Sequence, residues 1–288
     1  IGSAALDCTP MVVLSATQER KAMENGWWQT LDVQKPVADF VKFQTRVERP
    51  DQAVAAVRDA LRASVSGKPG VAQIDIPIDV STDELGTDDV PAPVRLATPH
   101  IRSFPDPGLV EKAADLLARA QRPVLLIGGG ANYSGAGGAL MRLAERLGAP
   151  VVNSPTSRGV LPESNALVLG CAGIIGYEPV GDAIREADLV LAIGSRLSDI
   201  QTSRGELLPA GAPIIQVDID PAALGKEYPP AVGVVSDAKA FADALNEILE
   251  ADASPVSDVR RNWTESLAAR YTAWRDEWLS STPDNGQV

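Results

Sequence analysis

The chain has 288 residues, of which 45% are hydrophobic and 22% charged, a balance typical of a folded globular protein. Its 38 acidic and 26 basic residues give a formal net charge of −12, and no cluster of Lys and Arg indicates nucleic-acid binding. One histidine, His100, argues against a His-based triad or a multi-histidine metal site. Cys8 and Cys171 form no disulfide framework, which favours a reducing cytoplasm, and no apolar run approaches a membrane span.

Residues 1–80 have the pattern of the second half of an α/β domain. The apolar run at 11–14 predicts a buried strand, and apolar residues at helical spacing predict a helix over 51–65. A second strand is expected over 71–77, where Pro77 ends it. Strand, helix and strand in this order imply a parallel sheet. Because the chain opens almost directly on a strand, we expect more of this domain upstream.

Residues 81–106 contain several prolines and acidic residues without a sustained period, which predicts a linker between two domains. His100 lies in this segment, and we expect it to be an exposed linker residue.

Residues 107–250 alternate strands and helices throughout, which predicts a doubly wound, Rossmann-like parallel sheet of five or six strands. The expected elements are helix 108–120, strand 123–127, helix 136–147, strand 149–155, helix 178–187, strand 188–195, strand 213–220, strand 233–237 and helix 238–249. Residues 251–288 follow as a helical tail. Within it, aromatic and leucine side chains recur at helical spacing over 258–279, which predicts an amphipathic helix docked on a core or a partner.

Three glycines directly after strand 123–127 give the strongest local signal of a ligand site. Glycines at a strand end let the backbone approach a pyrophosphate, and the next helix directs its free N–H groups at the anion. The run is not a strict G-x-G-x-x-G, so a tight turn remains the alternative. The glycines are Gly128, Gly129 and Gly130.

Polar residues follow other predicted strands of the same domain. Because parallel strands end at one edge of a sheet, these groups are expected to meet there and bind phosphate or ribose. Helix capping before Pro221 is the alternative role for the two aspartates that precede it. The strand-end groups are Asn153 to Ser157, Gly194 to Arg196, Asp218 to Asp220, and Ser236 with Asp237.

Two further groups lie in the first domain. Trp27, Trp28 and Gln29 stand in a loop-like stretch, and adjacent tryptophans indicate an interface or a pocket wall, with core packing as the alternative. Asp75 and Asp79, on either side of Pro77, are expected to be structural, one held in the strand and one a helix cap.

The sequence resembles the thiamine diphosphate-dependent enzymes. The segments GWWQTLD and ASVSGKPGVAQIDIPIDV are similar to the close of the pyrimidine-binding domain of that superfamily. The segments RPVLLIGGGANYSGAGGALMRLAERLGAPVV, GVLPESN, EADLVLAIGSRLSD and QVDIDP are similar to its central domain. The similarity covers residues 1 to about 250 in the expected order and is nearest to the branch of acetolactate synthase, oxalyl-CoA decarboxylase and 2-hydroxyacyl-CoA lyase.

This resemblance implies an enzyme with three domains that binds thiamine diphosphate and Mg²⁺ between two subunits of a homodimer or homotetramer. Such an enzyme makes or cleaves a carbon–carbon bond next to a carbonyl of a 2-oxo acid or acyl-CoA substrate. The family's activating glutamate and its G-D-G motif have no counterpart here, so no catalytic residue is assigned. The chain is expected to be a fragment that is inactive alone, joining the end of the pyrimidine-binding domain to the central domain.

The resemblance also implies a nucleotide in the central domain, FAD in acetolactate synthases or ADP in oxalyl-CoA decarboxylase. Ile78 replaces the lysine of acetolactate synthases, Val71 replaces a proline, and AGIIG at 172–176 lacks a histidine, so an ADP-binding acyl-CoA enzyme is an alternative. A stand-alone nucleotide-binding module and a structural subunit are the others. The contacts carried over are Gly128, Gly129, Gly130, Thr156, Ser157, Gly194, Arg196, Asp218, Ile219 and Asp237, with Trp27, Trp28 and Gln29 as a substrate wall.

Overall fold

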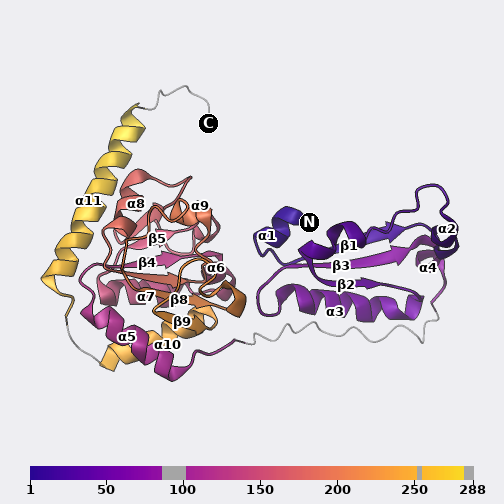
Figure 1. Cartoon of the computed structure of the whole chain (residues 1–288), viewed down its shortest axis with the longest axis horizontal. Coiled ribbons are helices and arrows are strands. Elements are labelled where there is room, and N and C mark those ends of the chain that lie inside the picture. The colour runs from indigo at the N-terminus through magenta and orange to yellow at the C-terminus, as the bar shows by residue number, and fades with distance from the viewer. Residues whose placement is uncertain (86–101, 252–254, 282–288) are drawn as a thin grey trace. The chain divides into compact units, whose positions relative to one another are not determined.

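The structure is a computed structural model that describes residues 1–85, 102–251 and 255–281. The chain divides into two compact units, Ile1–Ile101 and Arg102–Val288, which are described separately below (Figure 1). Much of the predicted linker, including His100, lies outside the described residues. No described helix is long and apolar enough to span a bilayer.

The first unit is built on three parallel strands in the order β1-β3-β2. The predicted strands are confirmed as β1 (Met11–Thr17) and β3 (Val71–Pro77), and the predicted helix as α3 (Ala53–Val65). Strand β2 (Val41–Arg46) was not anticipated, although its sequence VKFQTR alternates apolar and polar residues as a half-buried strand does. The shorter helices are α1 (Gly2–Leu6), α2 (Arg20–Asn25), η1 (Lys35–Phe40), η2 (Pro50–Gln52) and α4 (Ile78–Thr82).

The central strand β3 has two chemically different faces. Ala72 and Ile74 belong to an apolar cluster that includes Ala60 of α3. Because successive strand residues point to opposite faces, Gln73 and Asp75 are directed to the other side, where both are buried. One face of this small sheet therefore packs on a helix, and the other carries buried polar groups.

The second unit is a six-stranded, fully parallel sheet in the order β6-β5-β4-β7-β8-β9. This is the strand order 3-2-1-4-5-6 of the doubly wound fold, so the predicted fold class is confirmed. An additional strand, β6, was not anticipated. The strands are β4 (Pro123–Ile127), β5 (Val151–Asn153), β6 (Val168–Cys171), β7 (Leu189–Ile193), β8 (Ile214–Asp218) and β9 (Val232–Val235).

Helices cover both faces of this sheet (Figure 1), which is why its strands are apolar without alternation. Side chains of α5, α6, α7 and α10 pack with Leu125 and Ile127 on one face, and those of α8 and α11 pack with Val124 and Leu126 on the other. The helices are α5 (Pro107–Arg119), α6 (Gly129–Ser134), α7 (Gly137–Leu147), α8 (Glu178–Arg185), α9 (Asp199–Thr202), α10 (Ala238–Ala251) and α11 (Asp258–Ser281).

The C-terminal helix α11 docks on the core of its own unit, as the aromatic periodicity predicted. Leu267 is buried beneath it, and the Tyr177 and Trp274 rings lie 4.6 Å apart between centroids. The Trp263 indole donates a hydrogen bond of 3.0 Å to Glu186 just beyond α8.

A buried arginine fixes the start of α11. Arg260 donates to the carbonyl oxygens of Leu117, Ala118 and Ala120 at the end of α5, and to that of Leu147 at the end of α7. Since the last carbonyls of a helix have no partner within it and carry partial negative charge, one guanidinium stabilises two helix ends.

The loops that follow β4 and β7 approach each other too closely for side chains. The N–H of Gly130 donates to the carbonyl of Gly194 over 3.0 Å, and the N–H of Gly128 to that of Ile193. A Cβ on Gly128 would lie 2.3 Å from the Gly194 oxygen, and one on Gly130 would lie 2.8 Å from the Gly194 Cα. Glycine is therefore required here by backbone packing.

We predict that Gly128→Ala lowers the free energy of unfolding of the second unit by about 1–3 kcal/mol, because the added methyl group overlaps fixed backbone. Gly138→Ala is the matched control, since its Cβ would have only an arginine tip 3.8 Å away on the exposed face of α7. Urea unfolding followed by circular dichroism measures both. Equal stabilities of the two variants would show that the close approach is not a constraint.

The contact between α8 and α11 should weaken in acid. Hydrogen bonds from Arg270 outweigh burial and, with one from Trp263, hold the pKa of Glu186 below its usual range. A carboxylate whose pKa is depressed by folding stabilises the protein above its unfolded pKa, and this contribution is lost as pH falls through the folded pKa.

We therefore expect Glu186→Gln to reduce stability at pH 7 by about 0.5–1 kcal/mol, the size of a partly exposed ion pair. The deficit should shrink as pH is lowered from 5 to 3, because the wild-type carboxylate is then protonated. Thermal unfolding at these pH values, with Glu145→Gln as control, measures the effect. A deficit that is independent of pH would contradict the assignment.

Candidate functional site

The strand ends of the second unit bring the predicted ligand residues to one edge of the sheet. Gly128 to Gly130 follow β4, and Thr156 and Ser157 lie in the 3-10 helix η4 (Pro155–Ser157) after β5. Gly194 and Arg196 follow β7, Asp218 ends β8 with Ile219 after it, and Asp237 follows β9. In doubly wound sheets this edge, near the point where strand order reverses between β4 and β7, is where ligands bind.

The glycines of this edge serve protein packing, as described above, and their predicted contact with a pyrophosphate stays a prediction. Gly129 faces another strand end, since a Cβ there would lie 2.9 Å from Oγ1 of Thr156. Thr156 and Arg196 are exposed, and Gly129 and Gly130 are half-buried. These residues offer hydroxyl, guanidinium and backbone groups to a ligand at the edge.

Ser157 is committed to the protein interior. It is fully buried, its hydroxyl donates to the carbonyl of Ile127 over 2.8 Å, and it accepts from the N–H of Ser154 over 2.9 Å. It therefore ties the end of β5 to the end of β4.

The two aspartates after β8 shape the local turn. Asp218 accepts from the N–H of Asp220 over 2.9 Å, and Asp220 accepts from the N–H of Ala222 over 3.0 Å at the start of η5 (Pro221–Ala223). The capping role is thus confirmed for Asp220.

Asp237 is the centre of a polar cluster that the sequence did not reveal. One of its carboxylate oxygens accepts from Arg102 over 2.7 Å, from the Ser134 hydroxyl over 2.8 Å, and from the N–H groups of Lys239 and Ala240. Arg102 and Ser134 lie 32 or more residues from Asp237 in the sequence, so no local signal could have found them. The carboxylate caps α10 and holds the segment that enters the second unit.

A buried amide at the same edge has unused hydrogen-bonding capacity. Asn153, the last residue of β5, is fully buried, and neither its Oδ1 nor its Nδ2 has a partner. An unsatisfied buried amide costs about 1–3 kcal/mol, so a water molecule or a ligand group is expected beside it. This is the observation of the structure that best agrees with a bound polar molecule at this edge.

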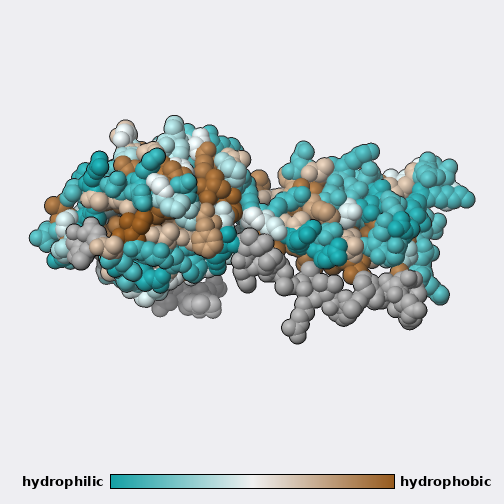
Figure 2. Space-filling view, turned by 90° about the horizontal axis from the view of Figure 1, so that it is seen from below, coloured by the Kyte–Doolittle hydropathy of each residue, from teal (hydrophilic) through white to brown (hydrophobic). Residues whose placement is uncertain are grey.

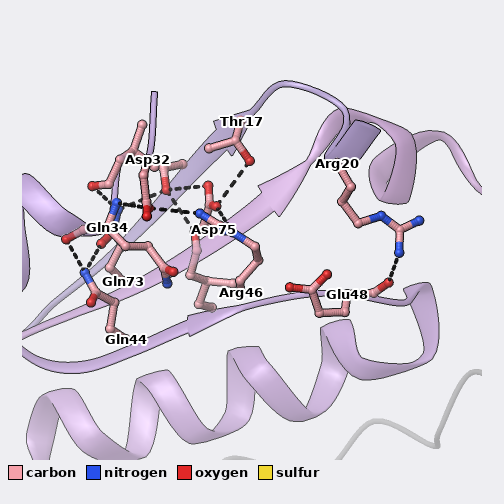
Figure 3. A network of polar contacts seen from close by, with 12 residues as sticks. Thr17, Arg20, Asp32, Gln34, Gln44, Arg46, Glu48, Gln73 and Asp75 are labelled. Carbon is pink, nitrogen blue, oxygen red and sulfur yellow. Dashed lines mark hydrogen bonds and ion pairs between the residues drawn. The ribbon is translucent and has the colours of Figure 1, made fainter. Parts of the chain in front are cut away.

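The polar face of the first unit is organised around Asp75 (Figure 3). This carboxylate is fully buried and accepts from Arg46 over 2.7 Å, Thr17 over 3.2 Å and Ser15 over 3.2 Å. Burying a carboxylate is costly unless it is paired and hydrogen-bonded, and here it is both. The prediction of a strand-held carboxylate is confirmed.

Asp79 does not act as the expected helix cap. It accepts from the backbone N–H and the guanidinium of Arg20, over 3.3 and 2.7 Å, and Pro77 stands at the N-cap of α4. The capping expectation is wrong because a partner 59 residues away reaches this carboxylate.

The predicted substrate wall lies on the surface of the first unit. Trp27 and Trp28 are 52% and 79% exposed, and Leu31 beside them is 62% exposed. Gln29 adopts the left-handed conformation, with φ of 58°. Core packing, the alternative for these tryptophans, is therefore wrong for the described chain. Hydrophobic side chains reach the surface of both units in Figure 2.

No group of three or more His, Cys, Asp or Glu residues could hold a metal ion within the described ranges. Mg²⁺ is accordingly not assigned to a residue of this chain.

Comparison with known proteins agrees with the fold. Residues 110–245 match the model of the thiamine pyrophosphate enzyme central domain. The chain is 32% identical over 269 residues to a probable acetolactate synthase large subunit of Methanocaldococcus jannaschii, covering 93% of this chain and 45% of the relative. It is 31% identical over 284 residues to the acetolactate synthase large subunit of Corynebacterium glutamicum, covering 96% and 44%.

A plant relative, acetolactate synthase 1, chloroplastic, of Zea mays, is 30% identical over 270 residues, covering 93% of this chain and 42% of the relative. The chain thus spans somewhat less than half the length of these relatives. The similarity runs through both units and is not confined to the nucleotide-binding type of sheet. The chain belongs to the thiamine diphosphate-dependent enzyme superfamily, and its second unit contains the central domain of that family.

Proposed function

We propose that the protein containing this chain is an acetolactate synthase-like enzyme that joins or cleaves a carbon–carbon bond beside the carbonyl of a 2-oxo acid. The observation that carries the proposal is the alignment with acetolactate synthases over 93% of the chain, which includes the first unit as well as the central domain. A stand-alone nucleotide-binding module would account only for the second unit. The relatives also do not favour the acyl-CoA enzymes.

The chemistry of the reaction belongs to the cofactor. Thiamine diphosphate, when bound, supplies an electron sink for the reacting carbon. We assign this chain the roles of scaffold and of part of the substrate wall, formed by Trp27, Trp28 and Gln29. We further propose a homodimer or homotetramer in the cytoplasm or in an organelle, and sedimentation of the natural protein tests the oligomer.

The second unit is proposed to bind a nucleotide across the edge formed by the strand ends. Thr156 and Arg196 are exposed there, and the unpartnered amide of Asn153 lies at the end of β5. Ser157 and Asp237 are engaged within the protein, and we assign them the support of neighbouring loops. FAD is the first candidate because the relatives are acetolactate synthases, and ADP is the second.

We predict that the purified chain binds added FAD and releases it on heating, with flavin absorbance between 300 and 500 nm. Arg196→Ala should weaken FAD binding about tenfold, the effect of losing one charge-assisted hydrogen bond. Arg142→Ala, which removes an exposed arginine of α7, is the control. Release of ADP in place of flavin would favour the second candidate, and no bound nucleotide at all would refute the site.

A separate prediction concerns the substrate wall. In the natural protein, assayed with pyruvate, thiamine diphosphate and Mg²⁺, Trp28→Ala should raise KM about tenfold with a smaller change in kcat, because an aromatic contact with the substrate is lost. Trp278→Ala, another half-exposed tryptophan in α11, is the control and should change neither constant. Equal KM values in both variants would remove Trp28 from the wall.

A further inference from the structure

The loop that carries the exposed tryptophans is held to the protein at both ends. We call residues 26–34, between α2 and η1, the tryptophan loop. At its start, Gly26 ends α2 in the left-handed conformation and the N–H of Trp27 donates to the carbonyl of Ala22 over 3.1 Å. At its end, Asp32, Val33 and Gln34 contact side chains of the sheet, as described next.

Three side chains of the polar sheet face hold the end of the tryptophan loop. Nη2 of Arg46 donates to Asp32 over 3.1 Å, and Nε2 of Gln44 donates to the carbonyl of Gln34 over 2.8 Å. Nε2 of Gln73 lies 3.4 Å from the carbonyl of Val33. Figure 3 shows Arg46 between Asp32 on the loop and Asp75 on β3.

Charge makes the arginine contact the strongest of the three. Arg46 bridges the fully buried Asp75 and the partly exposed Asp32, whose side chain is 31% exposed. Burial opposes ionisation of Asp32, but the Gln34 N–H and the Arg46 guanidinium outweigh it and hold the pKa of Asp32 below its usual range. Charge-assisted hydrogen bonds of this kind are about twice as strong as neutral ones.

The helix before the loop is fixed in a similar way. Arg20, the first residue of α2, binds Asp79 over 2.7 Å and the carbonyl of Glu48 over 2.9 Å. Two ion pairs thus fix the segment on either side of the tryptophans. Between them, the left-handed Gln29 is a conformation that costs about 1–2 kcal/mol and persists only where the surroundings impose it.

We infer that Asp75, Arg46 and Asp32 form a positioning relay that fixes the tryptophan loop, so that its exposed aromatic side chains are presented in one arrangement. The buried pair orients the guanidinium, and the guanidinium orients the loop through Asp32. None of the three residues touches the substrate in this role. Its consequence for turnover rests on the proposed function, whereas its effect on the loop does not.

Hydrogen exchange of the 288-residue chain tests the relay. Asp32→Asn keeps the shape of the side chain but removes its charge, and amides of residues 27–34 should then exchange about tenfold faster. Amides of β3 should remain protected, since the Asp75–Arg46 pair is intact. Asp32→Glu, which restores a carboxylate, should recover most of the protection. Asp51→Asn, which removes an exposed carboxylate paired with Arg49, is the matched control.

Asp75→Asn tests the buried half of the relay, and its β3 amides report whether the unit remains folded. If Asp32→Asn exchanges in the loop as Asp51→Asn does, the inference is overturned. In the natural protein, Asp32→Asn should raise KM for pyruvate more than it lowers kcat. Faster loop exchange with an unchanged KM would leave the relay in place and reject the tryptophan loop as substrate wall.

Discussion

The close approach of the loops after β4 and β7 is the constraint on which the second unit depends. At this point the strand order reverses, and two neighbouring strands send their connections to opposite sides. Gly128 and Gly130 lie against Gly194 with no room for a Cβ. The same glycines that a sequence reader associates with a pyrophosphate are needed to close the sheet edge itself. A ligand at this edge would lie on a surface that the protein has already packed.

Many polar groups at the strand ends serve the fold before they serve a ligand. Ser157 joins β5 to β4, Asp220 begins a turn, and Asp237 caps α10 while binding Arg102. Such internal bonds orient neighbouring exposed groups, as outer-shell residues do around a bound molecule. Thr156 and Arg196 are exposed among these fixed supports.

The first unit uses buried charge in the same manner. A carboxylate within a sheet is tolerated because Arg46 and two hydroxyl groups satisfy it, and its arginine extends the interaction to a surface loop. Membership of the thiamine diphosphate superfamily gives this loop a context, since the chain aligns with acetolactate synthases through both units. The polar face of the sheet and the exposed tryptophans are then parts of one arrangement.

The sequence by itself determined the fold class, most strands and helices, the docking helix α11 and the superfamily, because these depend on local apolar periodicity and on contiguous motifs. It missed β2 and β6, which are short and weakly apolar. Only the tertiary structure decided which polar groups are engaged. Arg20 with Asp79 and Arg102 with Asp237 join residues 59 and 135 positions apart, and such pairings follow from the packing of whole elements, which no local pattern encodes.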